Sequence, residues 1–275
     1  MLKRFAVLAL VLVLLAAFVP SASAQSAVGA TWDSSITYYT PDPTGGTMQV
    51  DYYSQTGTKY SANPIALSGN KAGSLYIGSV GALPSSFSGA AVLSADVPIV
   101  ATYVQFAAGA QAGEYGRALY SAFDASKAAT PFYIPTVLLN QFNTTSRIGV
   151  QNVESFSIDA TLTFKESGQS DIVHTVTIPA QSSYIFMPDD IPGMRDPFNG
   201  ALTITAHQTG DASTDGRIVA ASQEGLVSGR AAYAFEGVAG GSSPVYMASM
   251  LCNYRPEQQV SYYAIQNAGT SATQV

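Results

Sequence analysis

Apolar and polar residues alternate through short segments along most of the chain. In SIDATLTFKESG (residues 157–168), Ile158, Ala160, Leu162 and Phe164 occupy every second position. A period of two places neighbouring side chains on opposite faces of an extended chain, which is the signature of a half-buried β-strand. The same alternation predicts further strands in MQVDYY (residues 48–53), DIVHTVTIPA (171–180) and GALTITA (200–206).

Turn-forming residues separate these runs, as in SQTG, ESGQ, PDDIPG and DPFNG. No segment after the N-terminal one combines a helical period with capping residues. The spacing gives about seven or eight short strands in roughly 110 residues, which predicts an antiparallel β-sandwich of immunoglobulin-like type. A jelly roll is the alternative. The Cys…Trp…Cys pattern of antibody domains is absent, because Trp32 is the only tryptophan and Cys252 the only cysteine.

The sequence repeats itself at a period near 113 residues. PFYIPTVLLN (131–140) matches PVYMASMLCN (244–253), and RALY (117–120) matches RAAY (230–233), both at this offset. FSGAAVLS matches FNGALTIT, 111 residues later. Matches in one order, with an insertion around HQTGDASTDG in the second copy, indicate a tandem duplication.

The repeat also sets the expected domain boundaries. VQN at residues 150–152 opens the second copy, and IQN at 265–267 follows 115 residues later, so YYAIQNAGTSATQV opens a third copy. We expect two tandem immunoglobulin-like sandwiches, at residues 25–143 and 144–257, followed by the incomplete start of a third repeat at 258–275. A longer reading frame that continues past Val275 is favoured, because repeat proteins commonly run to several copies.

The first 24 residues have the features of a secretory signal peptide. Lys3 and Arg4 precede an apolar run at residues 5–19, and Ala22-Ser23-Ala24 offers a small-residue cleavage site. The run is shorter than the roughly 20 residues that span a bilayer. We therefore expect an exported chain that is secreted or held at the cell surface, without a membrane span after cleavage.

The repeat unit resembles one found in exported proteins of filamentous bacteria of the Chloroflexi kind. Those repeats open on an xIxVQNxGS strand, continue through VTVTYYDxxG and PDDxxLPxGFxGSAVVxS, and close on YLPLVMKNY. The second copy here reads RIGVQNVES, ATLTFKESG, MPDDIPGMRDPFNGALTIT and VYMASMLCNY. The first copy departs at its opening, ITYYTPDPTGG. The resemblance implies surface or extracellular modules with no assigned catalytic residues.

Composition narrows the possible partners. Charged residues make up 11% of the chain, against a typical value of about 25%, and cleavage of the signal peptide takes the formal net charge from −6 to −8. An acidic chain without a basic patch is not expected to bind nucleic acid.

Candidate reactive residues each have a structural interpretation that we favour. His174 falls in phase with apolar neighbours, and His207 opens the inserted loop. Neither has a second ligand at metal spacing, and the chain contains no G-x-S-x-G motif. The adjacent carboxylates Asp189 and Asp190 lie in turn-forming sequence. Asp211 and Asp215, with Gly216, have only part of a calcium-loop pattern.

The remaining candidates concern packing and surface. Cys252 aligns with Leu139, which predicts a small buried side chain. Asn143-Thr144-Thr145 has the form of a glycosylation sequon. Strand propensity accounts for most of the tyrosines, although an aromatic binding surface remains an alternative. Those tyrosines are Tyr38, Tyr39, Tyr52, Tyr53, Tyr60, Tyr262 and Tyr263.

These observations favour an exported, non-enzymatic repeat protein with a structural, adhesive or cell-surface role. We expect no catalytic, cofactor-binding or metal-binding residues. The partner would be a protein or glycan at the cell surface, or another copy of the chain bound through the C-terminal repeat start. The first alternative is a carbohydrate-binding accessory module, and the second is a secreted hydrolase.

Overall fold

The computed structural model describes residues 26–108, 116–252, 261–269 and 271, and these residues are almost entirely strands and turns. The predicted signal peptide, residues 1–24, lies outside the described residues. No helix in the described ranges is long and apolar enough to cross a membrane.

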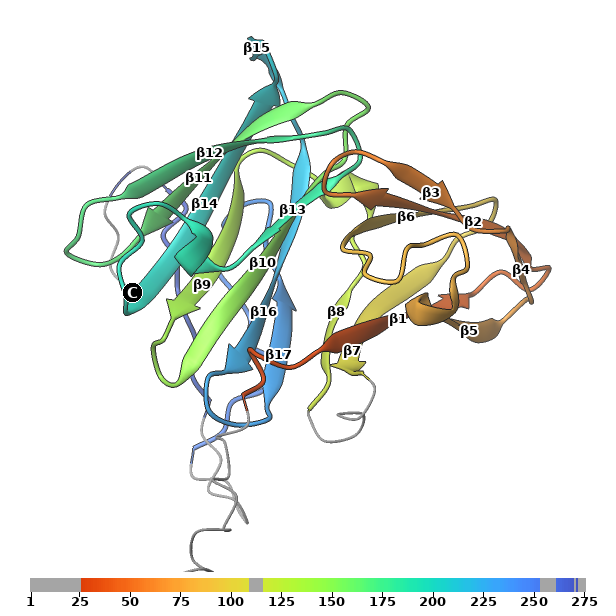
Figure 1. The fold of residues 1–275 in the computed structure, drawn as a ribbon, viewed down its shortest axis with the longest axis horizontal. Helices are drawn as coiled ribbons and strands as arrows, with labels where there is room; N and C mark the ends of the chain where they lie inside the picture. Colours follow the sequence, from red (N-terminus) through yellow and green to blue (C-terminus); the bar gives the residue numbers. More distant parts are fainter. Residues whose placement is uncertain (1–25, 109–115, 253–260, 270, 272–275) are drawn as a thin grey trace, which may run out of the picture.

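Eight strands form the first half of the described chain (Figure 1). They are β1 (Trp32–Thr40), β2 (Gly46–Ser54), β3 (Lys59–Ser61), β4 (Ile65–Leu67), β5 (Lys71–Tyr76), β6 (Gly89–Ala95), β7 (Val100–Ala107) and β8 (Ala118–Ser121). Two short 3-10 turns accompany them, η1 (Ile77–Ser79) and η3 (Ala125–Lys127).

Nine strands form the second half. They are β9 (Phe132–Leu139), β10 (Thr144–Asn152), β11 (Ile158–Lys165), β12 (Ile172–Ile178), β13 (Ser183–Phe186), β14 (Phe198–Gln208), β15 (Asp211–Asp215), β16 (Ile218–Leu226) and β17 (Ala232–Glu236). A further 3-10 turn, η4 (Pro188–Asp190), follows β13.

The described strands pair into four small sheets, arranged as the four blades of a β-propeller. Sheet 1 has the order β5-β1-β7-β8, and sheet 2 places β3, β4 and β6 around β2. Sheet 3 has the order β13-β10-β16-β17, and sheet 4 the order β12-β11-β14-β15 with β9 also on β14. The predicted pair of tandem immunoglobulin-like sandwiches, and the jelly-roll alternative, are therefore wrong, although the all-β class is right.

Strand pairing is the reason for this correction. In an immunoglobulin-like domain the first strand pairs with the second. Here β10 pairs with β13 and β16, while β11 pairs with β12 and β14. An alternating sequence fixes which face of a strand is buried, but it does not choose the neighbouring strand.

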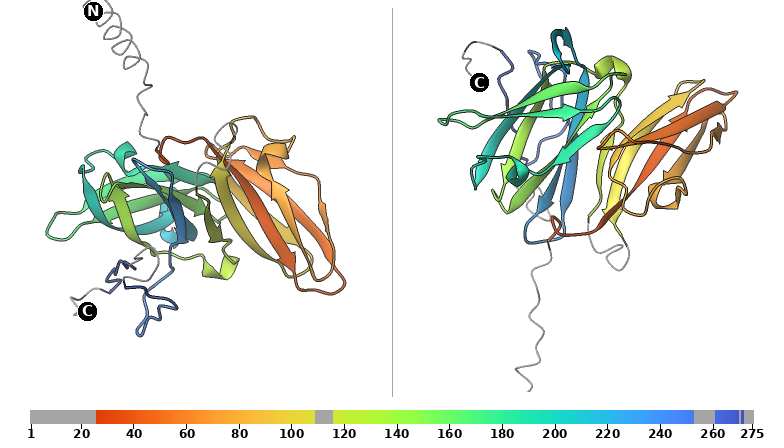
Figure 2. Two further views of the ribbon diagram at one scale, coloured as in Figure 1. Left: turned by 90° about the horizontal axis from the view of Figure 1, so that it is seen from below. Right: turned by 45° about the horizontal axis from the view of Figure 1, so that its top comes forward.

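The same pairing order occurs in both halves. Strand β1 lies between β5 and β7 as β10 lies between β13 and β16, and β2 pairs with β6 as β11 pairs with β14. A duplicated sequence predicts this correspondence. The two halves lie side by side in the views of Figure 2.

Two apolar cores hold the sheets together. One joins sheets 3 and 4 and contains fully buried Leu162, Phe164, Leu202 and Ile204. The other joins sheets 1 and 2 around Met48, Val50 and Tyr52, and most of its remaining apolar members are only partly buried. The strand alternation read from the sequence is confirmed in β11, whose buried positions are Ile158, Ala160, Leu162 and Phe164.

Strand β9 belongs to the sheet of the second half. The expected domain boundary at residue 143 places this strand at the end of the first copy. The connection is short, because β9 ends at Leu139 and β10 begins at Thr144. Its ladder, however, is with β14, where Leu202 faces Ile134.

The C-terminal residues contain no strand in their described part, which includes 244–252 and 261–269. The sequence predicts a closing strand and the opening of a third copy there. One local feature of that opening is present, because the Asn267 side chain donates to the Ser271 carbonyl (2.7 Å) and accepts from the Gly269 amide (2.9 Å).

Asn152 makes the corresponding contacts inside the second half. Its Nδ2 donates to the carbonyls of Phe156 (2.8 Å), Ile178 (3.1 Å) and Pro179 (3.0 Å), and its Oδ1 accepts from the Glu154 amide at 2.8 Å. The side chain is fully buried. Buried carbonyls without partners are unfavourable, so the final Asn of VQN ties the end of β10 to the end of β12.

Asn152→Ala removes these bonds and leaves buried carbonyls unpaired. We expect a loss of about 3 kcal/mol in the free energy of unfolding, measured by urea denaturation. Asn267→Ala is the matched control, since it removes the equivalent turn at an exposed position. Its effect is expected within about 0.5 kcal/mol of zero. Equal effects of the two substitutions would contradict the role of Asn152.

Candidate functional site

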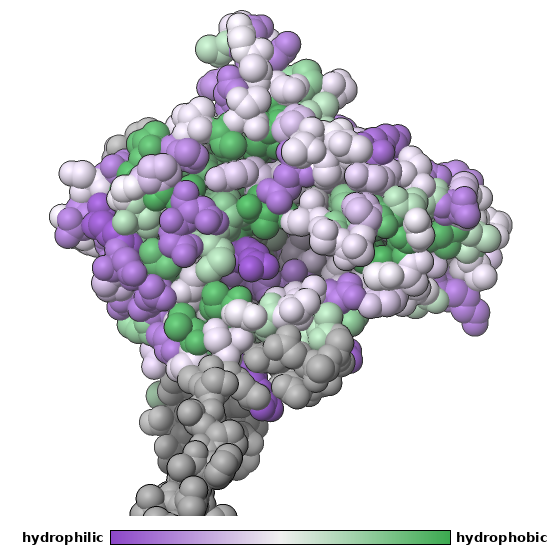
Figure 3. Space-filling view, viewed as in Figure 1, coloured by the Kyte–Doolittle hydropathy of each residue, from purple (hydrophilic) through white to green (hydrophobic). Residues whose placement is uncertain are grey.

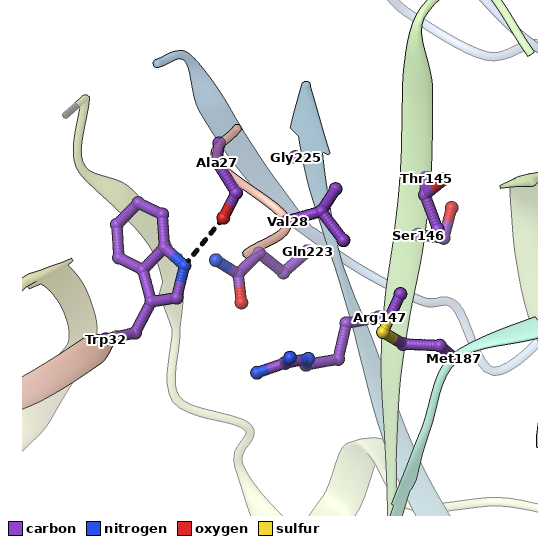
Figure 4. A pocket seen from close by; sticks show the side chains of 9 residues that line it. All are labelled: Ala27, Val28, Trp32, Thr145, Ser146, Arg147, Met187, Gln223 and Gly225. Carbon is purple, nitrogen blue, oxygen red and sulfur yellow. Dashed lines mark hydrogen bonds between the residues drawn. The ribbon is translucent and has the colours of Figure 1, made fainter. Parts of the chain in front are cut away.

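A small cavity lies where the N-terminal segment and β1 meet sheet 3 (Figure 4). The Trp32 indole Nε1 donates to the Ala27 carbonyl at 3.0 Å, and the Ala27 amide donates to the Leu226 carbonyl at 2.9 Å. The cavity measures about 20 Å³, which is room for one water molecule. Its lining includes Thr145, Arg147, Met187 and Gln223. It is a joint between the two halves, too small for an organic substrate.

A larger groove, of about 370 Å³, lies on the first half. Its lining is Ser61, Ala62, Asn63, Ile65, Leu75, Ser79, Val80, Gly81 and Ala82. The two hydroxyls already have acceptors, since Ser61 donates to Asp51 and Ser79 to the Tyr76 carbonyl. Because no lining side chain is ionisable or aromatic, the groove offers neither acid–base catalysis nor ring stacking to a bound molecule.

The two histidines lie on different strands and have different surroundings. His174 is half-buried on β12, opposite Leu162 and in phase with the inward-facing positions of its strand, as predicted. His207 lies on β14, where its Nδ1 is 3.3 Å from the Asp215 carboxylate, and both side chains are well exposed. Within the described ranges, no three His, Cys, Asp or Glu side chains form a group that could hold a metal ion.

The adjacent carboxylates have different surroundings. Both side chains are exposed, but only the Asp190 carboxylate accepts the hydrogen bond from the Met187 amide, at 2.7 Å, that closes the η4 turn. This is the turn chemistry that the sequence predicts. Neither carboxylate lines either of the two cavities described above.

The inserted loop is a β-hairpin of β14 and β15. The Asp211 carboxylate accepts bonds from the Ser213 amide (3.0 Å), the Ser213 hydroxyl (2.6 Å) and the Thr214 hydroxyl (2.8 Å). These bonds, led by the one from Ser213, lower the pKa of Asp211. Its oxygens are used to hold the turn, and Asp215 points to His207 instead.

The tyrosines are spread over different environments. Tyr52 is buried, with its ring edge-on to Phe87, and burial raises its pKa to about 12. Tyr60 also packs on Phe87. Tyr262 and Tyr263 are exposed near the other end of the chain. They do not form the single aromatic surface that remained an alternative.

The two remaining candidates are Cys252 and Asn143. Cys252 is exposed, so the prediction that it is a small buried side chain is wrong for this chain on its own. Asn143 of the sequon-like sequence binds Ser228 through three bonds, including one from its Nδ2 to the Ser228 carbonyl at 2.7 Å. These bonds join the β9–β10 turn to the loop after β16.

Glu224 is a titratable group that no sequence pattern singled out. It lies on β16 between Ser146 of β10 and Tyr233 of β17, and its Oε1 lies 3.5 Å from the Thr136 hydroxyl. Burial raises the pKa of its carboxyl. The side chain is partly buried, and its neighbour from another sheet is Thr136 of β9.

Comparisons with known proteins give no relative: no family model, curated protein or solved structure matches the chain. The function must therefore be argued from the residues themselves.

Replacing Glu224 with Gln is expected to stabilise the protein at pH 7. Because the pKa is raised in the folded state, the ionised carboxylate disfavours folding above that pKa. This cost disappears as the pH falls below the ordinary value of 4.5, where the carboxyl is protonated in both states. Urea denaturation at pH 7 and pH 4 measures the difference. Asp189→Asn, at an exposed carboxylate, should show no such gain, and a destabilised Glu224→Gln at pH 7 would refute the argument.

Proposed function

We propose that the chain is an exported, non-enzymatic repeat protein with a structural, adhesive or cell-surface role. The observation that carries this proposal is the junction between the two halves. The two halves have the same order of strand pairing and are fixed to each other by contacts at several places. Such a rigid arrangement suits a structural protein that bears force along its length. A freely hinged pair would not.

A row of aromatic rings crosses this junction. Tyr103 of β7 lies 5.0 Å from Tyr120 of β8, which lies 6.3 Å from Phe123, which lies 6.1 Å from Phe132 of β9, measured between ring centroids. Pairs at these separations attract one another beyond their burial. The row runs from sheet 1 of the first half to Phe123 and Phe132, which pack in the core of the second half.

Hydrogen bonds reinforce the junction at separate points. The Gly116 amide donates to the Arg230 carbonyl at 2.9 Å, and the Ser121 amide donates to the Glu236 carboxylate. At another point, the Ile185 amide of β13 donates to the Gln55 side chain at 3.0 Å. Strands β8 and β17 are neighbours in the same region, where Ala118 and Ala232 are buried together.

The surroundings of the candidate catalytic residues support a non-enzymatic role. Asp190 and Asp211 are engaged in turns, and Asp215 lies beside His207 on a hairpin. A hydrolase requires an acid and a base that face one substrate position, and these residues serve turns instead. The resemblance of the repeat motifs to exported surface modules supports the same role.

A carbohydrate-binding module is the alternative with a specific feature in its favour, the 370 Å³ groove. The Asn63 amide on its rim could bind a sugar hydroxyl. Against this, no aromatic ring lines the groove, and stacking on such a ring is what fixes a sugar in many binding sites. The surface shown in Figure 3 mixes hydrophilic and hydrophobic residues around the recess between the halves.

Export can be tested by expressing the full sequence in a bacterial host and fractionating the cells. We expect a processed chain that begins at Gln25 in the extracellular or surface fraction, identified by intact mass. Ala24→Leu is expected to block processing, because the site requires a small residue there. A glycan array with the processed chain then tests the alternative. An unprocessed chain in the cytoplasm would contradict the proposal.

The junction can be tested with Tyr120→Ala, which removes the middle ring of the aromatic row. We expect the two halves to move relative to one another, which small-angle scattering would show as a larger radius of gyration and spread of distances. Tyr233→Ala is the control on the neighbouring β17, since Tyr233 is 57% exposed. An unchanged scattering curve for Tyr120→Ala would mean that the row does not hold the junction.

A further inference from the structure

The ladder between β9 and β14 shows how one core of this protein is completed. Phe132, Ile134, Val137 and Leu139 of β9 are almost fully buried in the second core. The strands run antiparallel, with Ile204 opposite Phe132, Leu202 opposite Ile134 and Phe198 opposite Leu139. Strand β9 therefore both covers apolar side chains and pairs the backbone on the far side of β14 from β11.

Strand β6 is the counterpart of β14 in the first half. It pairs with β2 as β14 pairs with β11, and its sequence FSGAAVLS corresponds to FNGALTIT at an offset of 111. The backbones agree in detail. A Cβ on Gly89 would meet the Tyr53 carbonyl oxygen at 2.1 Å, and one on Gly200 would meet the Lys165 carbonyl oxygen, also at 2.1 Å.

The far edge of β6 has no strand on it among the described residues, where β6 pairs with β2 alone. The inward-facing residues of β6 are correspondingly less buried than those of β14. Leu202, Ile204 and Ala206 of β14 are 0% exposed, whereas Ala91, Leu93 and Ala95 at the same positions of β6 are only partly buried. An uncovered apolar edge of this kind can pair with another extended segment.

Residues 244–252, here called the donor segment, are the sequence counterpart of β9. The positions that β9 buries as Phe132, Ile134, Val137 and Leu139 are Val245, Met247, Met250 and Cys252, all apolar. In the structure the donor segment forms no strand and is largely exposed. The exposed fractions are 65% for Val245, 86% for Tyr246, 53% for Met247 and 64% for Met250.

We propose that the donor segment of one copy pairs with β6 of a second copy, as β9 pairs with β14 within the chain. Transferring the observed register predicts an antiparallel ladder with Leu93 opposite Val245, Val92 opposite Tyr246 and Ala91 opposite Met247. Backbone hydrogen bonds would provide affinity, and the alternate apolar side chains would enter the first core. This deepens the proposed surface role by naming the partner and the interface.

A second copy is the occupant because of where the two elements lie. The C-terminal segments are beside the second half in Figures 1 and 2, while β6 lies in the first half. Each copy then offers one donor segment and one acceptor edge on different halves. Such a head-to-tail contact builds rings or open filaments. Among the described strands of the second half, β13 comes near β6, but it forms no ladder with it.

The first experiment measures assembly of the processed chain by sedimentation velocity over a range of concentrations. We expect species larger than the monomer that grow with concentration, and their loss in Met247→Asp, which places a charge at a core-facing position of the donor. Val173→Asp is the matched control, since it charges an exposed apolar residue on β12 and should leave assembly unchanged. A purely monomeric chain, or assembly that survives Met247→Asp, would overturn the proposal.

The second experiment tests the register with engineered cysteines in a Cys252→Ser background. Val92→Cys with Tyr246→Cys places two cysteines directly opposite, where cross-strand Cβ atoms are about 5 Å apart. We expect disulfide-linked oligomers under mild oxidation. Ser94→Cys with Tyr246→Cys is mismatched by two residues and should link far less. A disulfide confined to the monomer would show pairing within one chain and refute the second-copy partner.

The third experiment separates this inference from the proposed function. A synthetic peptide of residues 243–253, with Ser in place of Cys252, should bind the Met247→Asp variant, whose acceptor edge is intact, and a scrambled peptide should not. Absence of peptide binding would overturn the strand pairing. It would leave the export and surface result standing, because that test does not involve assembly.

Discussion

The pairing of β9 with β14 is the interaction on which the described architecture depends. A sheet edge that carries apolar side chains on its inner face exposes both unpaired backbone groups and hydrophobic surface. Strand β9 removes both, and it delivers Phe132 and Ile134 into the core. It also joins the halves, because the chain leaves the last strand of the first half, β8, and reaches β9 through the η3 turn. The aromatic row that ends at Phe132 follows from this crossing.

The two halves differ where this pairing is missing. They share the order of strands and the conformation at Gly89 and Gly200, yet the second core is sealed and the first remains partly open. The buried polar residues at the ends of β1 and β10 also differ between the halves. Asn152 satisfies three carbonyls in the second half, and Thr40 binds only the Pro98 carbonyl in the first. The duplicated unit is thus more complete in its second copy.

Several polar side chains of the protein have structural roles in turns and in the β14–β15 hairpin. The carboxylates of Asp190 and Asp211 accept hydrogen bonds from turn amides and hydroxyls, and His207 on the hairpin lies beside Asp215. The insertion that distinguishes the second copy folds as the β14–β15 hairpin. Polar groups in such positions stabilise loops and hairpins at the surface, where recognition by partners takes place.

The sequence by itself determined the strands, the repeat and the turns, because period-two burial and turn residues are local properties. The inward positions of β11, the inward placement of His174 and the turn role of Asp190 could all be read from it. Strand partners could not be read, since a period of two selects a face and leaves the neighbour open. Only the tertiary structure decided that β10 pairs with β13 and β16, that β9 belongs to sheet 4, and that Glu224 is partly buried beside it. These outcomes depend on which edges meet, and contacts between distant segments settle that question.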